Sequence, residues 1–280
     1  MEVKRDYDQG TLAITQTDYV ENLLERFEMQ NANIAHTPGY GQELSSEQPE
    51  DKLLGAQGIK LYQSITGSLL YLAQCTRYDL CYAVNQLTRA CNRPAEVHMT
   101  AAKHVLRYLR GTPDLPITYR KGQLRLVSHT DASFGANPDN RKSTTGYLFF
   151  LGGAPISFGS KTQSLTAQST VESKLQALSY GAREAVYLSN FLTELGLKDS
   201  SQVPIRSDST GALSVAGNSM FSARTKHIAL RYFFVRELVK KNKIILHYTP
   251  TKQMLADIAT KHLSKHTFRD LLQQIKNFTS

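Results

Sequence analysis

The sequence lacks any apolar run near the roughly 18 residues of a membrane-spanning helix, and its N-terminus, MEVKRDYDQG, has no apolar signal-peptide core. Its only cysteines are Cys75, Cys81 and Cys91, an odd number without a CxxC pair. These absences argue against a membrane protein, a disulfide framework and a cysteine-based zinc site. We therefore expect a cytoplasmic or nuclear protein with buried thiols and no membrane partner.

The composition is that of a folded protein with a strongly basic second part. Of its 280 residues, 41% are hydrophobic and 20% charged, which argues against a disordered chain. Residues 1–120 carry a net charge of −2, whereas residues 121–280 carry +11. A segment this basic would attract a polyanion such as nucleic acid. The alternative is a basic surface that serves only solubility.

Residue patterns divide the chain into five stretches. Residues 1–30 predict a hairpin around Gly10 followed by an amphipathic helix. Residues 31–57 are rich in Pro, Gly and Ser without periodicity and predict a linker. Residues 58–120 repeat a helical pattern three times and predict a small bundle. Residues 121–265 form the main α/β stretch, and residues 266–280 predict a final helix and tail.

The α/β stretch opens with three strand-like runs in succession, LRLVSHTD, TTGYLFFL and APISFGS. A helical stretch of about 25 residues follows, and then the pattern alternates between strand and helix, with the strand-like runs VPIRSD and KIILHYT. Strands first and alternation afterwards predict a mixed sheet with helices on its faces.

Three acidic residues stand at places where they could converge. Asp131 ends the first strand-like run of this stretch, Asp208 ends VPIRSD, and Asp257 follows the last strand. Carboxylates gathered at one edge of a sheet suit Mg²⁺ or Mn²⁺, which activate water and stabilise phosphoryl transfer. The alternative is that each is an ordinary cap or turn residue, since Asp favours such positions.

Five runs of the chain resemble the C-terminal part of the copia-type (LTR) retrotransposon Pol polyprotein. They are YQSITGSLLYLAQCTRYDLCYAVNQL, AAKHVLRYLRGT, RKSTTGYLFFLGGAPISFGSK, ARTKHIALRYFFVREL and YTPTKQMLADIATKHL. The resemblance implies the end of a reverse transcriptase, with the palm-end hairpin and helix in residues 1–30 and a helical thumb in residues 58–120. For residues 121–265 it implies an RNase H domain, a five-stranded mixed sheet with flanking helices that cuts RNA–DNA hybrids with Mg²⁺ or Mn²⁺.

Two family features are missing from the chain. It contains no YxDD motif, which in this family carries the polymerase aspartates and would lie upstream of Met1, so we do not expect polymerisation by this chain. The family's usual tryptophans are also absent, with Met99, Phe134 and Phe158 at the matching places. Because the palm that a thumb packs against is not part of this sequence, the remaining Pol polypeptide is an expected partner.

Carried over position by position, the RNase H acids fall on Asp131 in HTDAS, Asp208 in RSDSTGA and Asp257 in LADIATK. The family's remaining acid, a Glu, is replaced by Lys174 in STVESKLQALS. Glu172 lies two residues earlier, about 200° around a helix, and is not expected to substitute for it. A lysine ammonium facing three aspartates predicts reduced metal affinity and weak or absent nuclease activity.

Nucleic-acid binding does not need the missing acid. A basic and polar set could contact phosphates: Arg141, Lys142, Lys161, Ser209, Arg224 and Lys226. The alternative is that much of this set is only a solvated surface. Three functional classes stay open: an RNA–DNA hybrid endonuclease, a catalytically silent nucleic-acid-binding module, and a structural or interaction remnant.

Overall fold

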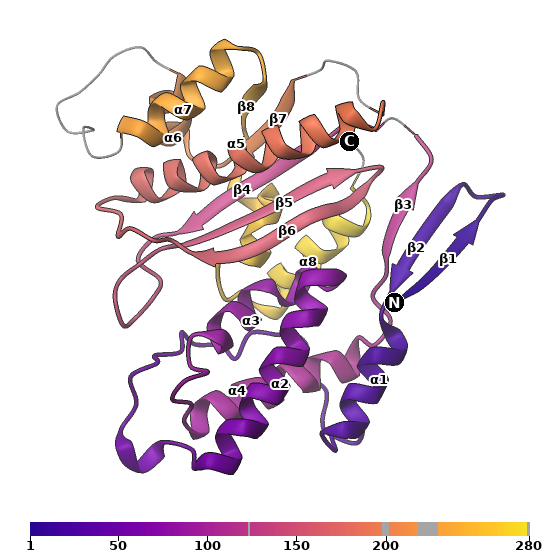
Figure 1. Cartoon of the computed structure of the whole chain (residues 1–280), viewed down its shortest axis with the longest axis vertical. Helices are drawn as coiled ribbons and strands as arrows, with labels where there is room; N and C mark the ends of the chain where they lie inside the picture. Colours follow the sequence, from indigo (N-terminus) through magenta and orange to yellow (C-terminus); the bar gives the residue numbers. More distant parts are fainter. Residues whose placement is uncertain (123, 198–201, 218–228, 279–280) are drawn as a thin grey trace.

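The computed structural model describes residues 1–122, 124–197, 202–217 and 229–278. Figure 1 shows a large twisted sheet with helices above it, a group of helices below it, and a separate smaller sheet at one side. The predicted nucleic-acid contacts Arg224 and Lys226 lie outside the described residues.

The large sheet has five strands in the order β6-β5-β4-β7-β8. Its strands are β4 (Val127–Ser133), β5 (Thr144–Leu151), β6 (Ala154–Thr162), β7 (Val203–Ser207) and β8 (Ile244–Tyr248). Strands β6, β5 and β4 pair antiparallel, whereas β4, β7 and β8 pair parallel. The predicted fold class, an α/β protein with a five-stranded mixed sheet and flanking helices, is confirmed.

The smaller sheet contains the N-terminal hairpin and one strand from much later in the chain. Strands β1 (Glu2–Asp6) and β2 (Thr11–Thr15) pair as predicted, and β2 also pairs with β3 (Ile117–Arg120). The sequence analysis missed β3, because a four-residue strand without a local partner has no hairpin signal.

The lower group of helices forms around a shared apolar core. It contains α1 (Thr17–Arg26), α2 (Ala56–Cys75), α3 (Cys81–Thr88) and α4 (Glu96–Gly111). Helical spacing gathers Ile65, Leu69 and Leu72 on one face of α2, where all three are buried. A short 3₁₀ turn, η2 (Tyr78–Leu80), joins α2 to α3.

The segment expected as a linker is irregular but closely attached. Apart from the 3₁₀ turn η1 (Glu50–Lys52), it has no regular element before α2, although Ala35 and Leu44 are buried. The Ser46 backbone N–H donates to the Asp139 carboxylate at 2.9 Å, and the Ser45 hydroxyl donates to the same group. These bonds tie the segment to the loop between β4 and β5.

The remaining helices cover the two faces of the large sheet (Figure 1). They are α5 (Thr170–Glu194), α6 (Thr210–Gly217), α7 (Ala229–Lys240), η4 (Thr251–Gln253), η5 (Leu255–Ala259) and α8 (Lys265–Lys276). Helix α5 runs along one face, with α6 and α7 beside it, while η5, α8 and the lower helices lie on the other. In the part of the chain that the structure describes, no helix is both long and apolar enough to cross a bilayer.

The alternation of side chains along the strands creates two separate cores. Phe149 packs with α5, α6 and α7, whereas its neighbours Leu148 and Phe150 pack with η5, α8 and the lower helices. The second core continues from the sheet into α2, α3 and α4 without interruption. The lower helices are therefore positioned by the same apolar surface that supports η5.

One glycine allows η5 to lie directly on the sheet. Gly146 in β5 is the register partner of Asp131 in β4. A Cβ atom on Gly146 would lie 2.5 Å from the Thr260 Cγ2 atom and 2.8 Å from the Ala256 carbonyl oxygen, closer than atoms can pack. This close approach brings Asp257 to the level of Asp131.

We expect the Gly146→Ala substitution to lower the free energy of unfolding by about 1–3 kcal/mol, because the added methyl group forces η5 away from β5. Urea unfolding followed by circular dichroism measures the change. The matched control is Gly67→Ala in the exposed middle of α2, where an added Cβ meets nothing within 4 Å. That change should stabilise the protein by about 0.4–1 kcal/mol; equal effects at both sites would contradict the packing argument.

Candidate functional site

The structure places the three predicted acids on three neighbouring elements. Asp131 lies in β4, Asp208 directly follows β7, and Asp257 lies in η5. Strands β4 and β7 are adjacent and parallel, and η5 packs against β4 and β5, so the fold brings these separate segments to one place. Asp131 is almost completely buried, with 1% of its surface exposed.

Two lysines join the three carboxylates. The Lys174 Nζ atom lies 2.9 Å from Asp131 Oδ1 and forms a second ion pair with Asp208 Oδ1. The Lys261 Nζ atom lies 2.9 Å from Asp257 Oδ1 and 3.8 Å from Asp131 Oδ2. We call these five residues the acid–lysine cluster. Asp131, which contacts both amines, stands at its centre.

Two threonine hydroxyls complete the contacts of the cluster. Thr260 Oγ1 donates to Asp131 Oδ2 at 3.1 Å, and Thr251 Oγ1 donates to Asp208 Oδ2 at 3.0 Å. Both threonines come from the segment that contains η4 and η5. The segment after β8 therefore supplies an acid, an amine and two hydroxyl donors to one site.

The pKa values of the cluster follow from burial and these pairs. Burial alone would raise the pKa of Asp131, but Lys174 and Lys261 outweigh it and hold that pKa below its usual value. Burial would lower the pKa of Lys174, but Asp131 and Asp208 raise it. Burial and the neighbouring Asp131 carboxylate raise the pKa of Asp257 to about 7, despite the Lys261 amine.

Glu172 has a different role at the start of α5. The Ser169 hydroxyl caps this helix by accepting from the Glu172 backbone N–H at 3.1 Å. In return, the Glu172 carboxylate accepts from the Gln168 backbone N–H at 2.7 Å, as in a capping box. The Glu172 side chain is thus engaged with the backbone that precedes α5, and Lys174 is the residue of this turn that reaches the acids.

The donor set of the cluster does not fit a divalent metal centre as it stands. Three carboxylates and two ammonium groups carry a net charge of only −1 when all five are ionised. The Lys174 amine is itself the cation that Asp131 and Asp208 share. Within the described residues, no group of three or more His, Cys, Asp or Glu side chains is arranged to hold a metal ion.

Lys261 is the member of the cluster that the sequence analysis missed. The signal was present, because Lys261 lies four residues after Asp257 in LADIATK, and this spacing places two side chains on one helical face. The ion pair between them has this spacing.

The four predicted nucleic-acid contacts among the described residues come from three different places in the fold. Lys161 lies at the end of β6, Arg141 and Lys142 belong to the loop before β5, and Ser209 caps α6 by accepting from the Ala212 backbone N–H at 3.1 Å. Lys161 lines a cavity of about 480 Å³ between the sheet, α5 and α7.

Two residues of α5 that the sequence analysis did not select share that cavity with Lys161. The Lys161 Nζ atom lies 5.3 Å from the centroid of the Tyr180 ring, and the Arg183 guanidinium carbon lies 5.2 Å from it. Arg231 of α7 lines the same cavity. We call Lys161, Tyr180, Arg183 and Arg231 the basic cavity; it combines cations with an aromatic face.

The raised pKa of Asp257 predicts a pH dependence. Below pH 4 the residue is protonated in both folded and unfolded chains; between pH 4 and 7 only the unfolded chain releases the proton, which favours unfolding. Relative to Asp257→Asn, the wild type should therefore lose stability as the pH rises from 4 to 7. Urea unfolding at pH 4.5 and 7.5 measures this, and parallel pH profiles of the two proteins would contradict it.

The chain is similar to two plant transposon proteins over almost its whole length. It is 37% identical over 273 residues to the retrovirus-related Pol polyprotein from transposon TNT 1-94 of Nicotiana tabacum, covering 96% of this chain and 20% of that protein. It is 36% identical over 270 residues to the corresponding polyprotein from transposon RE1 of Arabidopsis thaliana, covering 94% and 18%. The chain thus spans about a fifth of the length of these curated relatives.

Among solved structures, RNase H1 from the halophilic archaeon Halobacterium salinarum aligns with a TM-score of 0.38 at 15% identity, over 49% of this chain and 94% of that chain. No family model matches the chain. The relatives extend over both the lower helices and the large mixed sheet. The chain belongs to the family of retrovirus-related Pol polyproteins from transposons.

Proposed function

We propose that this chain is the thumb and RNase H part of a copia-type Pol polyprotein, and that it binds RNA–DNA hybrids or related nucleic acid with little or no cleavage. One observation supports the proposed lack of cleavage. The Lys174 amine forms ion pairs with both Asp131 and Asp208, two of the residues that the resemblance assigns to metal binding.

The chemistry of hydrolysis explains why this contact matters. In RNase H-type cleavage, Mg²⁺ or Mn²⁺ ions held by carboxylates activate a water molecule and stabilise the leaving oxygen. An ammonium group satisfies the carboxylates electrostatically, but it has no coordination sites for water or for a phosphate oxygen. The Lys174 side chain is only 13% exposed, so a metal ion would have to displace a largely buried ion pair.

The basic cavity supports the binding half of the proposal. Lys161 and Arg183 lie against the Tyr180 ring and Arg231 lines the same cavity, on a segment whose net charge is strongly positive. Cations neutralise backbone phosphates, and an aromatic face accommodates a base or sugar without sequence preference. A cytoplasmic or nuclear location and association with the rest of Pol stay predictions from the sequence.

The reversion Lys174→Glu tests the role of the amine. We expect it to raise Mg²⁺-dependent or Mn²⁺-dependent cleavage of a labelled RNA–DNA hybrid by about tenfold or more, which corresponds to about 1.4 kcal/mol of barrier. The reason is that the change replaces a cation with a fourth metal-binding carboxylate. Gel analysis of the cut RNA strand measures the rate.

Two controls sharpen this test. Lys174→Gln removes the positive charge without adding a ligand and should cleave much less than Lys174→Glu. The substitution Asp131→Asn in the reverted protein should abolish the gained activity. Robust cleavage by the wild type that depends on Asp131, or no gain from the reversion in a folded protein, would overturn the proposal.

The binding half predicts a steep dependence on salt. We expect hybrid affinity to fall with rising KCl, and Lys161→Gln and Arg183→Gln each to reduce the slope of log K against log[salt] by about 1, because each removes one phosphate contact. Fluorescence anisotropy with a labelled hybrid measures this. Arg5→Gln on β1 is the matched control and should change nothing; a flat salt response of the wild type would contradict binding through phosphates.

A further inference from the structure

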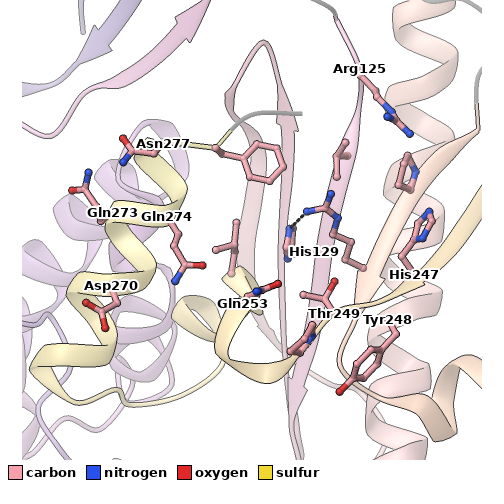
Figure 2. A pocket seen from close by; sticks show the side chains of 16 residues that line it. Arg125, His129, His247, Tyr248, Thr249, Gln253, Asp270, Gln273, Gln274 and Asn277 are labelled. Atoms are coloured by element: carbon pink, nitrogen blue, oxygen red, sulfur yellow. Dashed lines mark hydrogen bonds between the residues drawn. The ribbon is translucent and has the colours of Figure 1, made fainter.

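A second, larger cleft lies near the edge of the large sheet, on the face that carries η5 and α8. Its volume is about 960 Å³, within the range of small-ligand sites. Figure 2 shows Arg125, His129 and His247 on the strand side, with Gln273 and Gln274 of α8 and the following Asn277 opposite them. None of these residues belongs to the acid–lysine cluster or the basic cavity.

Arg206 of β7 is held in a fixed position in this cleft. Its Nη1 atom donates to His129 Nε2 at 3.4 Å, and its guanidinium carbon lies 5.8 Å from the centroid of the Phe278 ring. The His129 Nε2 atom accepts this hydrogen bond, because a guanidinium carries donors only. A guanidinium has five N–H donors, and a single one is used by His129.

A second guanidinium faces the same cleft. Arg125, just before β4, lines it together with Arg206, and the two guanidinium groups lie near enough for their charges to interact. Among the described residues, neither arginine has an ion-pair partner within 4 Å. Two neighbouring cations without a counter-charge repel each other, and a bound anion would relieve that repulsion.

The opposite wall adds neutral hydrogen-bonding groups. Gln273, Gln274 and Asn277 each carry an amide that can donate to an oxygen atom. The wall also contains one acid, Asp270, whose Oδ2 atom lies 2.9 Å from His266 Nδ1, and one carboxylate against the two guanidinium groups leaves a net positive charge. The cleft as a whole therefore presents donors and positive charge.

We propose that this cleft binds a phosphate group, with Arg206 and Arg125 as its principal ligands. A planar guanidinium matches the spacing of two phosphate oxygens and can bind them with two parallel hydrogen bonds. Because Arg206 is already oriented by His129 and Phe278, little side-chain freedom is lost on binding. The phosphate can come from a free nucleotide or from the backbone of a nucleic-acid strand.

Calorimetric titration of the full chain tests the proposal with three probes: inorganic phosphate, a nucleoside 5′-monophosphate, and a short DNA strand without terminal phosphates. We expect saturable binding of at least one, weakened about tenfold or more by Arg206→Gln and several-fold by Arg125→Gln. Binding of the monophosphate alone identifies a free nucleotide as the source, whereas binding of the strand identifies a nucleic-acid backbone.

The matched control is Arg5→Gln on β1, which lies outside both sites and should leave binding of all three probes unchanged. Loss of strand binding that follows Arg183→Gln, and not Arg206→Gln or Arg125→Gln, belongs to the basic cavity. This separates the cleft from the hybrid-binding proposal, since each has its own arginine variants. If Arg206→Gln impairs folding, as seen by circular dichroism, the exposed Arg125→Gln variant decides the outcome. Absence of saturable binding by all three probes, or binding that Arg125→Gln and folded Arg206→Gln leave unaltered, would overturn the proposal.

Discussion

The constraint on which the site depends is the cost of keeping three carboxylates together away from water. The Asp131 side chain has no exposed surface, and those of Asp208 and Asp257 are each only 7% exposed. Isolated buried charges of one sign are strongly destabilising unless they are paired or protonated. This protein combines both solutions, because Lys174 and Lys261 pair with the acids and Asp257 retains its proton up to about neutral pH.

The pairing of the acids with the two lysines also affects metal binding. A site that recruits divalent cations keeps uncompensated negative charge, whereas the acid–lysine cluster is nearly neutral before any ion arrives. Lys174 is held by two carboxylates in the folded protein. The same contacts that stabilise the buried acids therefore oppose metal binding. Under the proposed function, pairing with the lysines and binding of metal ions compete for the same three side chains.

Strand β4 connects the acid–lysine cluster to the cleft on the same face of the sheet. Asp131 and His129 are two residues apart, so their side chains point to the same side. A similar link follows β8, where Thr249 lines the cleft and Thr251 donates to Asp208. The acidic and basic groups thus occupy adjacent parts of one surface. A phosphate held in the cleft would lie beside the acids without competing for their lysines.

The sequence by itself determined the order of the strands and helices in the α/β stretch, the hairpin at Gly10 and the positions of the three acids, since these follow from periodicity, turn residues and family motifs. It also identified Lys174 as the unusual residue, because a change of charge at one aligned position is visible without coordinates. Tertiary structure alone decided which cations approach Asp131, how β3 pairs with β2, and that Arg125 and Arg206 share a cleft. Those contacts join residues far apart in the chain, and only the packing of the folded sheet and helices brings them within bonding distance.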